Sequence, residues 1–279
     1  MINNISRRDF IKTTAAGTVG AVGGAIGAGA LLSAPGCKKE GWFAIPQFAM
    51  NILGATSYKA VMADYKTSSN PRRSWVTGSG ARIRDVVKSS EGKKVDNFAW
   101  EFELVEDSTI NAWCMPGARI AFYEGIMDHC QNENGVAIVM GHEIAHAVYN
   151  HGGQRMAQQL TIQLGITALN SVIEKRFADP NDSEIQNIAR QVFGVGLQTG
   201  ANLALLAYSR KHEYEADKLG IIYAAKAGYD PREAPNFWER MSKLGGGGPE
   251  FLSTHPSNAN RIKALNDAMP EAMKHYNPA

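Results

Sequence analysis

The sequence is poor in cysteine and carries almost no net charge. Of its 279 residues only three are cysteines, too few for a scaffold held by several disulfides. Residues 1–36 hold three bases and one acid, and setting them aside leaves 26 basic and 26 acidic residues in the rest of the chain. A neutral body without a basic tract excludes nucleic acid as the main partner. The length and the 44% hydrophobic content suit one large domain or two small ones.

The body also lacks internal repeats and a convincing membrane-spanning run. The apolar stretch Val192–Ala207 contains Gln198, Thr199 and Asn202, which make it too short and too polar to cross a bilayer. The absence of repeats excludes a helical-repeat array.

Residues 1–36 have the pattern of an export signal. The paired arginines Arg7 and Arg8 precede residues 13–34, a mildly apolar stretch rich in glycine and alanine. A charged head before an apolar segment is typical of secretory signals, and the paired arginines resemble a twin-arginine signal. We therefore expect an exported, periplasmic protein whose folded body is residues 37–279.

The end of this signal allows three interpretations. The segment from Leu31 to Cys37 resembles a lipoprotein cleavage site, after which Cys37 would carry the lipid. Cleavage near Ala34 without a lipid, or an uncleaved anchor helix, would also fit. All three place the body outside the cytoplasmic membrane. Lipidation of Cys37 would make the protein a membrane-anchored lipoprotein at the surface of the inner or outer membrane.

The body is predicted to be α+β and mainly α. Asn97–Glu106 alternates apolar and acidic residues, as a half-buried strand does, while Ile110–Met115 and Arg119–Tyr123 flank a Pro-Gly turn. We expect these strands to form one small antiparallel sheet. Helices are expected over residues 47–65, 81–90, 136–150, 155–176, 184–227, 232–244 and 258–269.

A His-Glu-x-x-His pattern lies within the helix expected at 136–150. Helix positions i and i+4 share one face, so His142 and His146 can hold the same ion. Glu143, on the same turn, can reach a water molecule there without being a ligand. Two imidazoles suit zinc, and catalytic zinc sites keep an open position beside three protein ligands. The sequence therefore predicts a centre with one Zn²⁺ ion per chain.

The third ligand has several candidates. The metzincin arrangement is excluded, because Gly152 stands where that class needs a histidine. His151 lies about 140° around the helix from His146, so we expect it at the surface or behind a ligand. Glu174 is a further candidate, but nothing downstream of it supports that role.

Glu213 and Asp217 form a stronger candidate pair. They lie at i and i+4 of an expected helix, so one carboxylate can bind zinc while the other accepts a hydrogen bond from a ligand imidazole. Spacing alone leaves open a solvated helix face with Glu–Lys pairs, since Lys211 and Lys218 are close by.

Together these motifs resemble one gluzincin family. The resemblance rests on Gly141–His146, Ser209–Asp217 and Asn111–Gly117, and covers about residues 75–268. The family is that of the CAAX prenyl proteases, the HtpX heat-shock protease, the mitochondrial Oma-type protease and the periplasmic β-barrel-assembly-enhancing protease. It implies a zincin-like helical domain whose small antiparallel sheet has an edge strand bordering the active-site cleft. It also implies zinc bound by His142, His146 and Glu213, Glu143 as the catalytic base, and Asp217 as a carboxylate behind a ligand.

Two further segments fit the resemblance. His255 and Arg261 resemble a late His-Pro…Arg motif, in which His255 would donate to the developing oxyanion or enter as a fourth ligand and block the water position. The neighbouring Gly245–Gly248 loop would supply the mobility. The alternative is a helix-start His-Pro with a surface arginine. Asn111 and Ala112, in the expected edge strand, would bind an extended substrate chain through backbone hydrogen bonds.

Cys114 and Cys130 also leave two alternatives. They would form a disulfide in an oxidising compartment, or remain two buried free thiols.

We expect a zinc-dependent metalloendopeptidase that cuts internal bonds of unfolded or misassembled envelope proteins. The alternatives are a non-catalytic zinc-binding chaperone or assembly factor on a protease fold, and an exopeptidase. The chain departs from the resembling proteins in lacking the membrane helices of some and the helical-repeat domain of another. It also has Ala118 where a second glycine is frequent in the family pattern.

Overall fold

The structure is a computed structural model that describes residues 47–156, 208–244, 250–256 and 259–278. Several sequence-based predictions fall outside these residues. They are the export signal 1–36, Cys37, Glu174, the glycines 245–248, the expected helix 155–176 beyond residue 156 and the expected helix 184–227 before residue 208.

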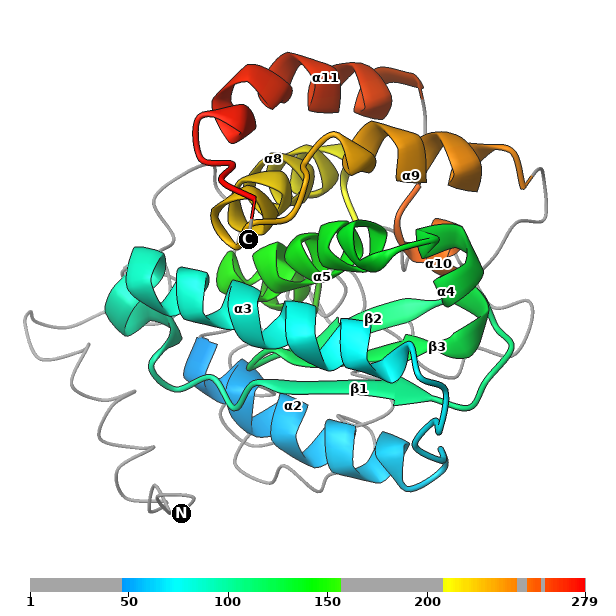
Figure 1. Ribbon diagram of the computed structural model, residues 1–279. Coiled ribbons are helices and arrows are strands. Elements are labelled where there is room, and N and C mark those ends of the chain that lie inside the picture. The colour runs from blue at the N-terminus through cyan, green and yellow to red at the C-terminus, as the bar shows by residue number, and fades with distance from the viewer. Residues whose placement is uncertain (1–46, 157–207, 245–249, 257–258, 279) are drawn as a thin grey trace, which may run out of the picture.

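The described elements are mostly helices, with one small sheet (Figure 1). In chain order they are α2 (Gln47–Met62), α3 (Arg73–Glu91), the 3₁₀ turn η2 (Gly92–Val95), β1 (Glu101–Val105), β2 (Ala112–Met115), β3 (Arg119–Tyr123), α4 (Glu124–Cys130), α5 (Glu133–Val148), α8 (Arg210–Lys226), α9 (Glu233–Ser242), α10 (Glu250–Thr254) and α11 (Ala259–Met273). The prediction of an α+β protein that is mainly α is confirmed.

The bounds of the predicted helices differ from those in the structure, and two of the N-terminal ends differ most. Helix α3 begins at Arg73 rather than at residue 81, because the buried residues Val76, Ile83 and Val87 continue the apolar face toward the N-terminus. Within the helix expected over residues 184–227, the described helix α8 begins at Arg210. Ser209 is extended there, and its hydroxyl accepts a hydrogen bond from the backbone N–H of His212, which is a helix N-cap.

The sheet is mixed, with the strand order β1-β3-β2. The hairpin is confirmed: β2 pairs antiparallel with β3, from Ala112 opposite Phe122 to Met115 opposite Arg119. The prediction of an antiparallel sheet is wrong for β1, which pairs parallel with β3. The chain reverses twice between β1 and β3, and β3 then lies between the other two strands, so β1 and β3 run the same way. In the part of the chain that the structure describes, β2 is consequently an edge strand.

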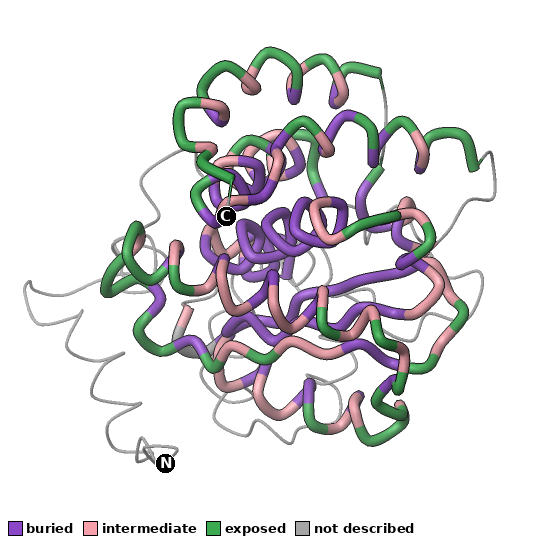
Figure 2. Tube along the Cα trace, viewed as in Figure 1, coloured by how far each residue is buried: buried purple, intermediate pink, exposed green. Residues whose placement is uncertain are grey.

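Helix α5 lies in the middle of the molecule, between the sheet with α2 on one side and α8, α9 and α11 on the other (Figure 1). Its N-cap is Asn132, whose side chain accepts a hydrogen bond from the N–H of Gly135 at 3.0 Å. Figure 2 shows α5 buried along almost its whole length, whereas α11 is largely exposed on its outer side. A helix that is apolar all round is stable only when other elements surround it.

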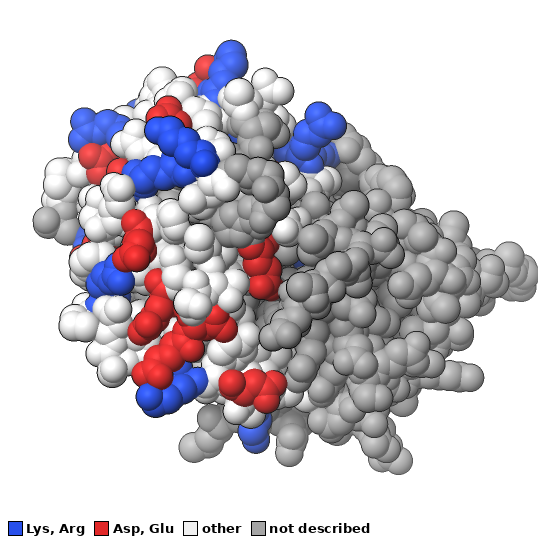
Figure 3. Space-filling model, turned by 90° about the vertical axis from the view of Figure 1, so that its right-hand side faces the viewer, with Lys and Arg blue, Asp and Glu red and all other residues white. Residues whose placement is uncertain are grey.

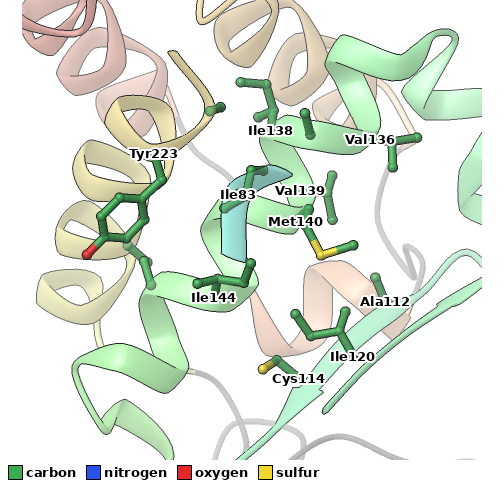
Figure 4. Packing of buried hydrophobic residues seen from close by; sticks show 14 of the residues in the cluster. Ile83, Ala112, Cys114, Ile120, Val136, Ile138, Val139, Met140, Ile144 and Tyr223 are labelled. Carbon is green, nitrogen blue, oxygen red and sulfur yellow. The ribbon is translucent and has the colours of Figure 1, made fainter. Parts of the chain in front are cut away.

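The apolar core joins α5 to the sheet and to two helices (Figure 4). Met140 and Ile144 of α5 lie close to Cys114 and Ile120 of the sheet, and Ile83 of α3 belongs to the same cluster. Because α5 is enclosed by packed side chains, its backbone is held as a rigid support for any functional group that it carries.

Helices α5 and α8 approach each other unusually closely at two glycines. A Cβ atom on Gly141 would lie 2.5 Å from the carbonyl oxygen of Gly220, and one on Gly220 would lie 2.7 Å from the backbone nitrogen of His142. Only glycine permits two helix backbones to come this close. This contact sets the distance between the polar residues of the two helices.

The described surface carries charges of both signs. On the face shown in Figure 3, acidic and basic side chains lie among uncharged ones. Within the described residues, none of the helices has the length and apolar character needed to cross a bilayer.

Candidate metal centre and active site

Four helices bring the candidate polar residues into one buried cluster. Helix α5 carries His142, Glu143 and His146 on consecutive turns, and α8 carries Glu213 and Asp217. His255 follows the end of α10, and Arg261 lies in the first turn of α11. All seven side chains are at most 4% exposed, so the site is within the protein interior.

Four potential ligand atoms converge within this cluster. One nitrogen each of His142, His146 and His255 and one oxygen of Glu213 all lie within 4.8 Å of one another. The Nε2 atom of His142 is 3.1 Å from both His146 Nε2 and His255 Nδ1. Glu213 Oε1 is 3.3 Å from His146 Nε2 and 3.2 Å from His255 Nδ1.

These residues fit a zinc ion. Ligand atoms bound to tetrahedral zinc at ~2.0–2.1 Å lie about 3.3 Å from one another, close to the distances observed here. The Nδ1 atom of His142 lies 3.0 Å from Asp217 Oδ1, a carboxylate that can only accept, so Nδ1 carries the proton. The Nε2 lone pair of His142 therefore points at the other nitrogens of the cluster. Lone pairs that face one another at 3.1 Å repel unless a cation lies between them.

The electrostatic surroundings also suit metal ligands. Burial lowers the pKa of His146 well below its ordinary value, which keeps this imidazole neutral. Burial alone would raise the pKa of Glu213, but the charges of Arg261 and His255 lower it well below its ordinary value. His146 therefore offers a neutral imidazole nitrogen and Glu213 an ionised carboxylate, the protonation states that a zinc ion needs.

Arg261 is the cation that balances the buried carboxylates. Its Nε and Nη2 atoms donate to the two oxygens of Asp217 at 2.6 and 2.7 Å, and its Nη1 lies 2.6 Å from Glu213 Oε2. The guanidinium also lies 3.6 Å from the ring centre of Trp238. Arg261 is 1% exposed, so the alternative of a surface arginine is wrong.

Glu143 lies beside the potential ligands. Burial raises its pKa above the ordinary value for a glutamate, which suits a group that takes up and releases a proton. Its Oε1 atom is buried, forms no hydrogen bond among the described residues, and lies 3.3 Å from His255 Nε2. The ring of His255 thus lies between the converging ligand atoms and Glu143.

The expected edge strand lies next to this cluster. A pocket beside His146 is lined by Cys114 of β2, by Pro116 just after it and by Tyr208. Asn111 and Ala112, the predicted substrate-binding residues, lie at the other end of β2 and do not line that pocket. Asn111 is nevertheless 1% exposed, and its side-chain nitrogen has no hydrogen-bond partner among the described residues.

His151 is the candidate for which the sequence analysis left two positions open. It is fully buried, and its Nδ1 atom lies 3.0 Å from Nδ1 of His146. A surface position is therefore wrong, and the position behind a ligand is observed. The angle of about 140° between His146 and His151 assumed that the helix continues to residue 151. Helix α5 instead ends at Val148, and the left-handed backbone of Asn150 (φ 54°) turns the chain back toward α5.

Tyr208 and Cys114 complete the surroundings of the site. The ring of Tyr208 stacks on that of His146 with 3.9 Å between ring centres. No sequence motif predicts this contact. Cys114 and Cys130 are buried free thiols, so the disulfide alternative is wrong.

Comparison with known proteins places this geometry in a family. Residues 80–269 match the model of peptidase family M48. The chain is 33% identical over 228 residues to the mitochondrial metalloendopeptidase OMA1 of Arabidopsis thaliana and 30% identical over 233 residues to that of Homo sapiens. Each alignment covers 80% of this chain and 43% of the relative. It is 33% identical over 165 residues to a putative beta-barrel assembly-enhancing protease of Vibrio cholerae, covering 58% of this chain and 33% of that protein. The chain thus spans about half the length of the curated relatives, and it belongs to peptidase family M48.

Proposed function

We propose that the protein is a zinc-dependent metalloendopeptidase that cuts internal peptide bonds of unfolded or misassembled envelope proteins. The observation that carries this proposal is the convergence of three imidazole nitrogens and the Glu213 carboxylate beside the buried Glu143. Membership of peptidase family M48 supports peptide hydrolysis, and similar proteins are named metalloendopeptidases.

In this proposal His142, His146 and Glu213 hold the zinc ion. When bound there, zinc polarises the scissile carbonyl and lowers the pKa of a water molecule to ~7. Glu143 accepts the proton of that water through its raised-pKa carboxylate and then donates it to the leaving amine. Asp217, held by Arg261, accepts the hydrogen bond from His142 and keeps the ring oriented.

His255 is proposed to control access to the reacting position. Its Nδ1 atom lies 3.1 Å from His142 Nε2 and 3.2 Å from Glu213 Oε1, which is where a fourth ligand would stand. In this position the ring excludes water from the space beside Glu143. A movement of His255 would open that space and let its imidazole donate to the developing oxyanion.

The substrate is proposed to be an extended polypeptide. Among the described residues, strand β2 has a paired neighbour on one side only, and its end lies beside the pocket next to His146. An extended chain can pair with such an edge, with the side chain of Asn111 as an additional donor. We expect a denatured protein to be cut faster than its folded form, and equal rates would contradict this part of the proposal.

Export and membrane attachment are further parts of the proposal. The twin-arginine pattern in residues 1–36 and the cleavage pattern before Cys37 support an exported lipoprotein at the inner or outer membrane surface. Among similar proteins is a putative beta-barrel assembly-enhancing protease from a bacterium. Metabolic labelling with a fatty acid would mark the protein but not its Cys37→Ser variant; labelling of both, or of neither, would contradict lipidation at Cys37.

The decisive experiment compares the parent protein with Glu143→Gln, each loaded with one zinc ion, on a denatured protein. Mass spectrometry of the products should show internal cuts by the parent and none by the variant, with zinc content equal in both. His146→Ala should lose both zinc and activity. Equal cleavage by Glu143→Gln would overturn the role of Glu143, and products trimmed only at chain ends would make the protein an exopeptidase. If zinc-loaded parent is inactive, His255→Ala should release activity.

A further inference from the structure

We propose that His151 and Glu215 position the metal ligand His146 through a two-step hydrogen-bond relay. The proposal rests on the zinc site proposed above and adds two residues to it. The relay runs from His146 through the buried ring of His151 to Glu215, whose side chain is 40% exposed. His151 and Glu215 are positioning residues, since neither reaches the converging ligand atoms.

The protons of the relay follow from two distances. His151 Nε2 lies 3.0 Å from Glu215 Oε2, and His151 Nδ1 lies 3.0 Å from His146 Nδ1. An ionised carboxylate can only accept, so His151 Nε2 carries a proton and donates a hydrogen bond to Glu215. A neutral imidazole has one donor and one acceptor, which leaves His151 Nδ1 to accept from His146 Nδ1–H. His146 is thereby fixed in the tautomer whose Nε2 lone pair faces the other ligand atoms.

Surrounding rings hold His151 in the orientation that the relay needs. The ring of His212 stacks on it with 4.4 Å between ring centres and 16° between planes. His212 Nε2 in turn lies 3.2 Å from Gln154 Oε1. Since Glu215 lies on α8, two residues from Glu213, the relay also joins the end of α5 to the helix that carries the carboxylate ligand.

The two imidazoles of α5 are therefore oriented by different means. His142 meets a carboxylate, Asp217, directly, and that charge is balanced by Arg261. A second carboxylate directly behind His146 would add another buried negative charge beside Glu143 and Glu213. Interposing the neutral ring of His151 moves that charge to the protein surface, where water stabilises it. The arrangement orients His146 without the cost of burying a further ion.

The test measures zinc affinity and the absorption spectrum of the Co²⁺-substituted protein, with no substrate present. His151→Leu removes both hydrogen bonds and should weaken zinc binding about 10–100-fold and change the Co²⁺ spectrum. His151→Gln keeps an acceptor and a donor and should bind zinc within about threefold of the parent. Glu215→Ala, a change at a partly exposed site, should weaken binding in the same direction as His151→Leu. Glu239→Ala, in an exposed position of α9, is the matched control and should change nothing.

Each outcome decides between the two proposals. Unchanged zinc affinity and Co²⁺ spectrum in both His151→Leu and Glu215→Ala would overturn the relay while leaving the zinc site intact. A His151→Gln variant as weak as His151→Leu would show that ring shape, rather than hydrogen bonding, is needed, and would also overturn it. A parent protein that binds no zinc would refute the proposed function itself. Circular dichroism of each variant identifies a loss of affinity caused by unfolding. If His151→Leu is unfolded, the zinc affinity of Glu215→Ala decides whether the relay exists.

Discussion

At the scale of single residues, Arg261 determines whether the carboxylates of the site can remain buried. It contacts Asp217 through two hydrogen bonds and approaches Glu213 with its third nitrogen. Removing one partner of a buried ion pair leaves an uncompensated charge in a medium that solvates it poorly. The late arginine of the sequence is therefore a structural requirement of the site.

We predict that Arg261→Met lowers the free energy of unfolding by about 3–5 kcal/mol, because Asp217 would remain buried without its cation. Urea denaturation followed by circular dichroism measures the change. The matched control is Lys263→Met on the same helix, whose side chain is 74% exposed and pairs with the exposed Asp267. That variant should change stability by less than about 1 kcal/mol. Equal effects of the two changes would contradict the role given to Arg261.

The two inner cysteines give a second prediction at this scale. Burial raises the pKa of Cys130 to about 12 and that of Cys114 well above its ordinary value. A raised pKa means that almost no thiolate is present at pH 8, and only the thiolate reacts with disulfide reagents. In a Cys37→Ser variant, such a reagent should label no thiol in the folded protein and two after denaturation. Rapid labelling of the folded protein would show that one of these thiols is accessible.

The residues whose positions follow from helix geometry were the part of the site that the sequence predicted best. The spacing of His142 and His146 depends only on helix geometry, so their convergence follows once the segment is known to be helical. The position of His151 depends on where α5 ends and on the left-handed turn at Asn150, and helix periodicity carries no information about either. The contacts of Tyr208 likewise depend on tertiary packing that no local pattern encodes.

At the scale of secondary-structure elements, the contact between α5 and α8 sets the geometry of the candidate metal site. The two glycines at this contact allow the backbones to touch, which brings Glu213 within 3.3 Å of His146. Any side chain at these positions would move the helices apart and separate the ligand atoms.

We predict that Gly220→Ala weakens zinc binding and lowers thermal stability, because the added methyl would lie 2.7 Å from the backbone of α5. Chelator competition measures the affinity, and differential scanning calorimetry measures the stability. The control is Gly78→Ala in α3, where a Cβ would meet only Glu133 at 3.7 Å. That change should leave zinc affinity unaltered and stabilise α3 by up to about 1 kcal/mol. Unchanged affinity in Gly220→Ala would show that the helix spacing tolerates the methyl group.

The sequence predicted which segments form helices and strands better than it predicted how the strands pair in the sheet. The alternation of Asn97–Glu106 identifies a strand without saying which neighbour it pairs with, and the parallel pairing of β1 with β3 follows from long-range packing. The short helix α10 contains only five residues and has no periodic signal of its own. Its position matters all the same, because it places His255 at the site.

At the scale of the whole molecule, the candidate ligands connect segments that are distant in the sequence. His142 and His146 come from the central helix, Glu213 from α8, and His255 from the segment after α10. An ion bound by all of them stabilises the folded state over the unfolded one, since the unfolded chain does not hold the ligands together.

We predict that removing zinc with a chelator lowers the melting temperature by about 10 °C. Free ligand at 1,000 times its dissociation constant stabilises the folded state by ~4.1 kcal/mol, and each kcal/mol corresponds to about 2–4 °C for a chain of this size. Differential scanning fluorimetry with and without chelator measures the shift. A His142→Ala/His146→Ala double variant should melt at the same temperature in both conditions. A parent protein that is insensitive to chelator would argue against a structural contribution of the ion.

The position of Arg261 after α8 in the chain order has a consequence for synthesis. A growing chain that has reached only Asp217 already contains the histidines of α5 and both carboxylates of α8, but not the cation that balances them. Those carboxylates favour solvent over burial until α11 is made, so the buried polar cluster cannot assemble before Arg261 has been synthesised. A chain released before Arg261 is made would therefore lack the assembled candidate site.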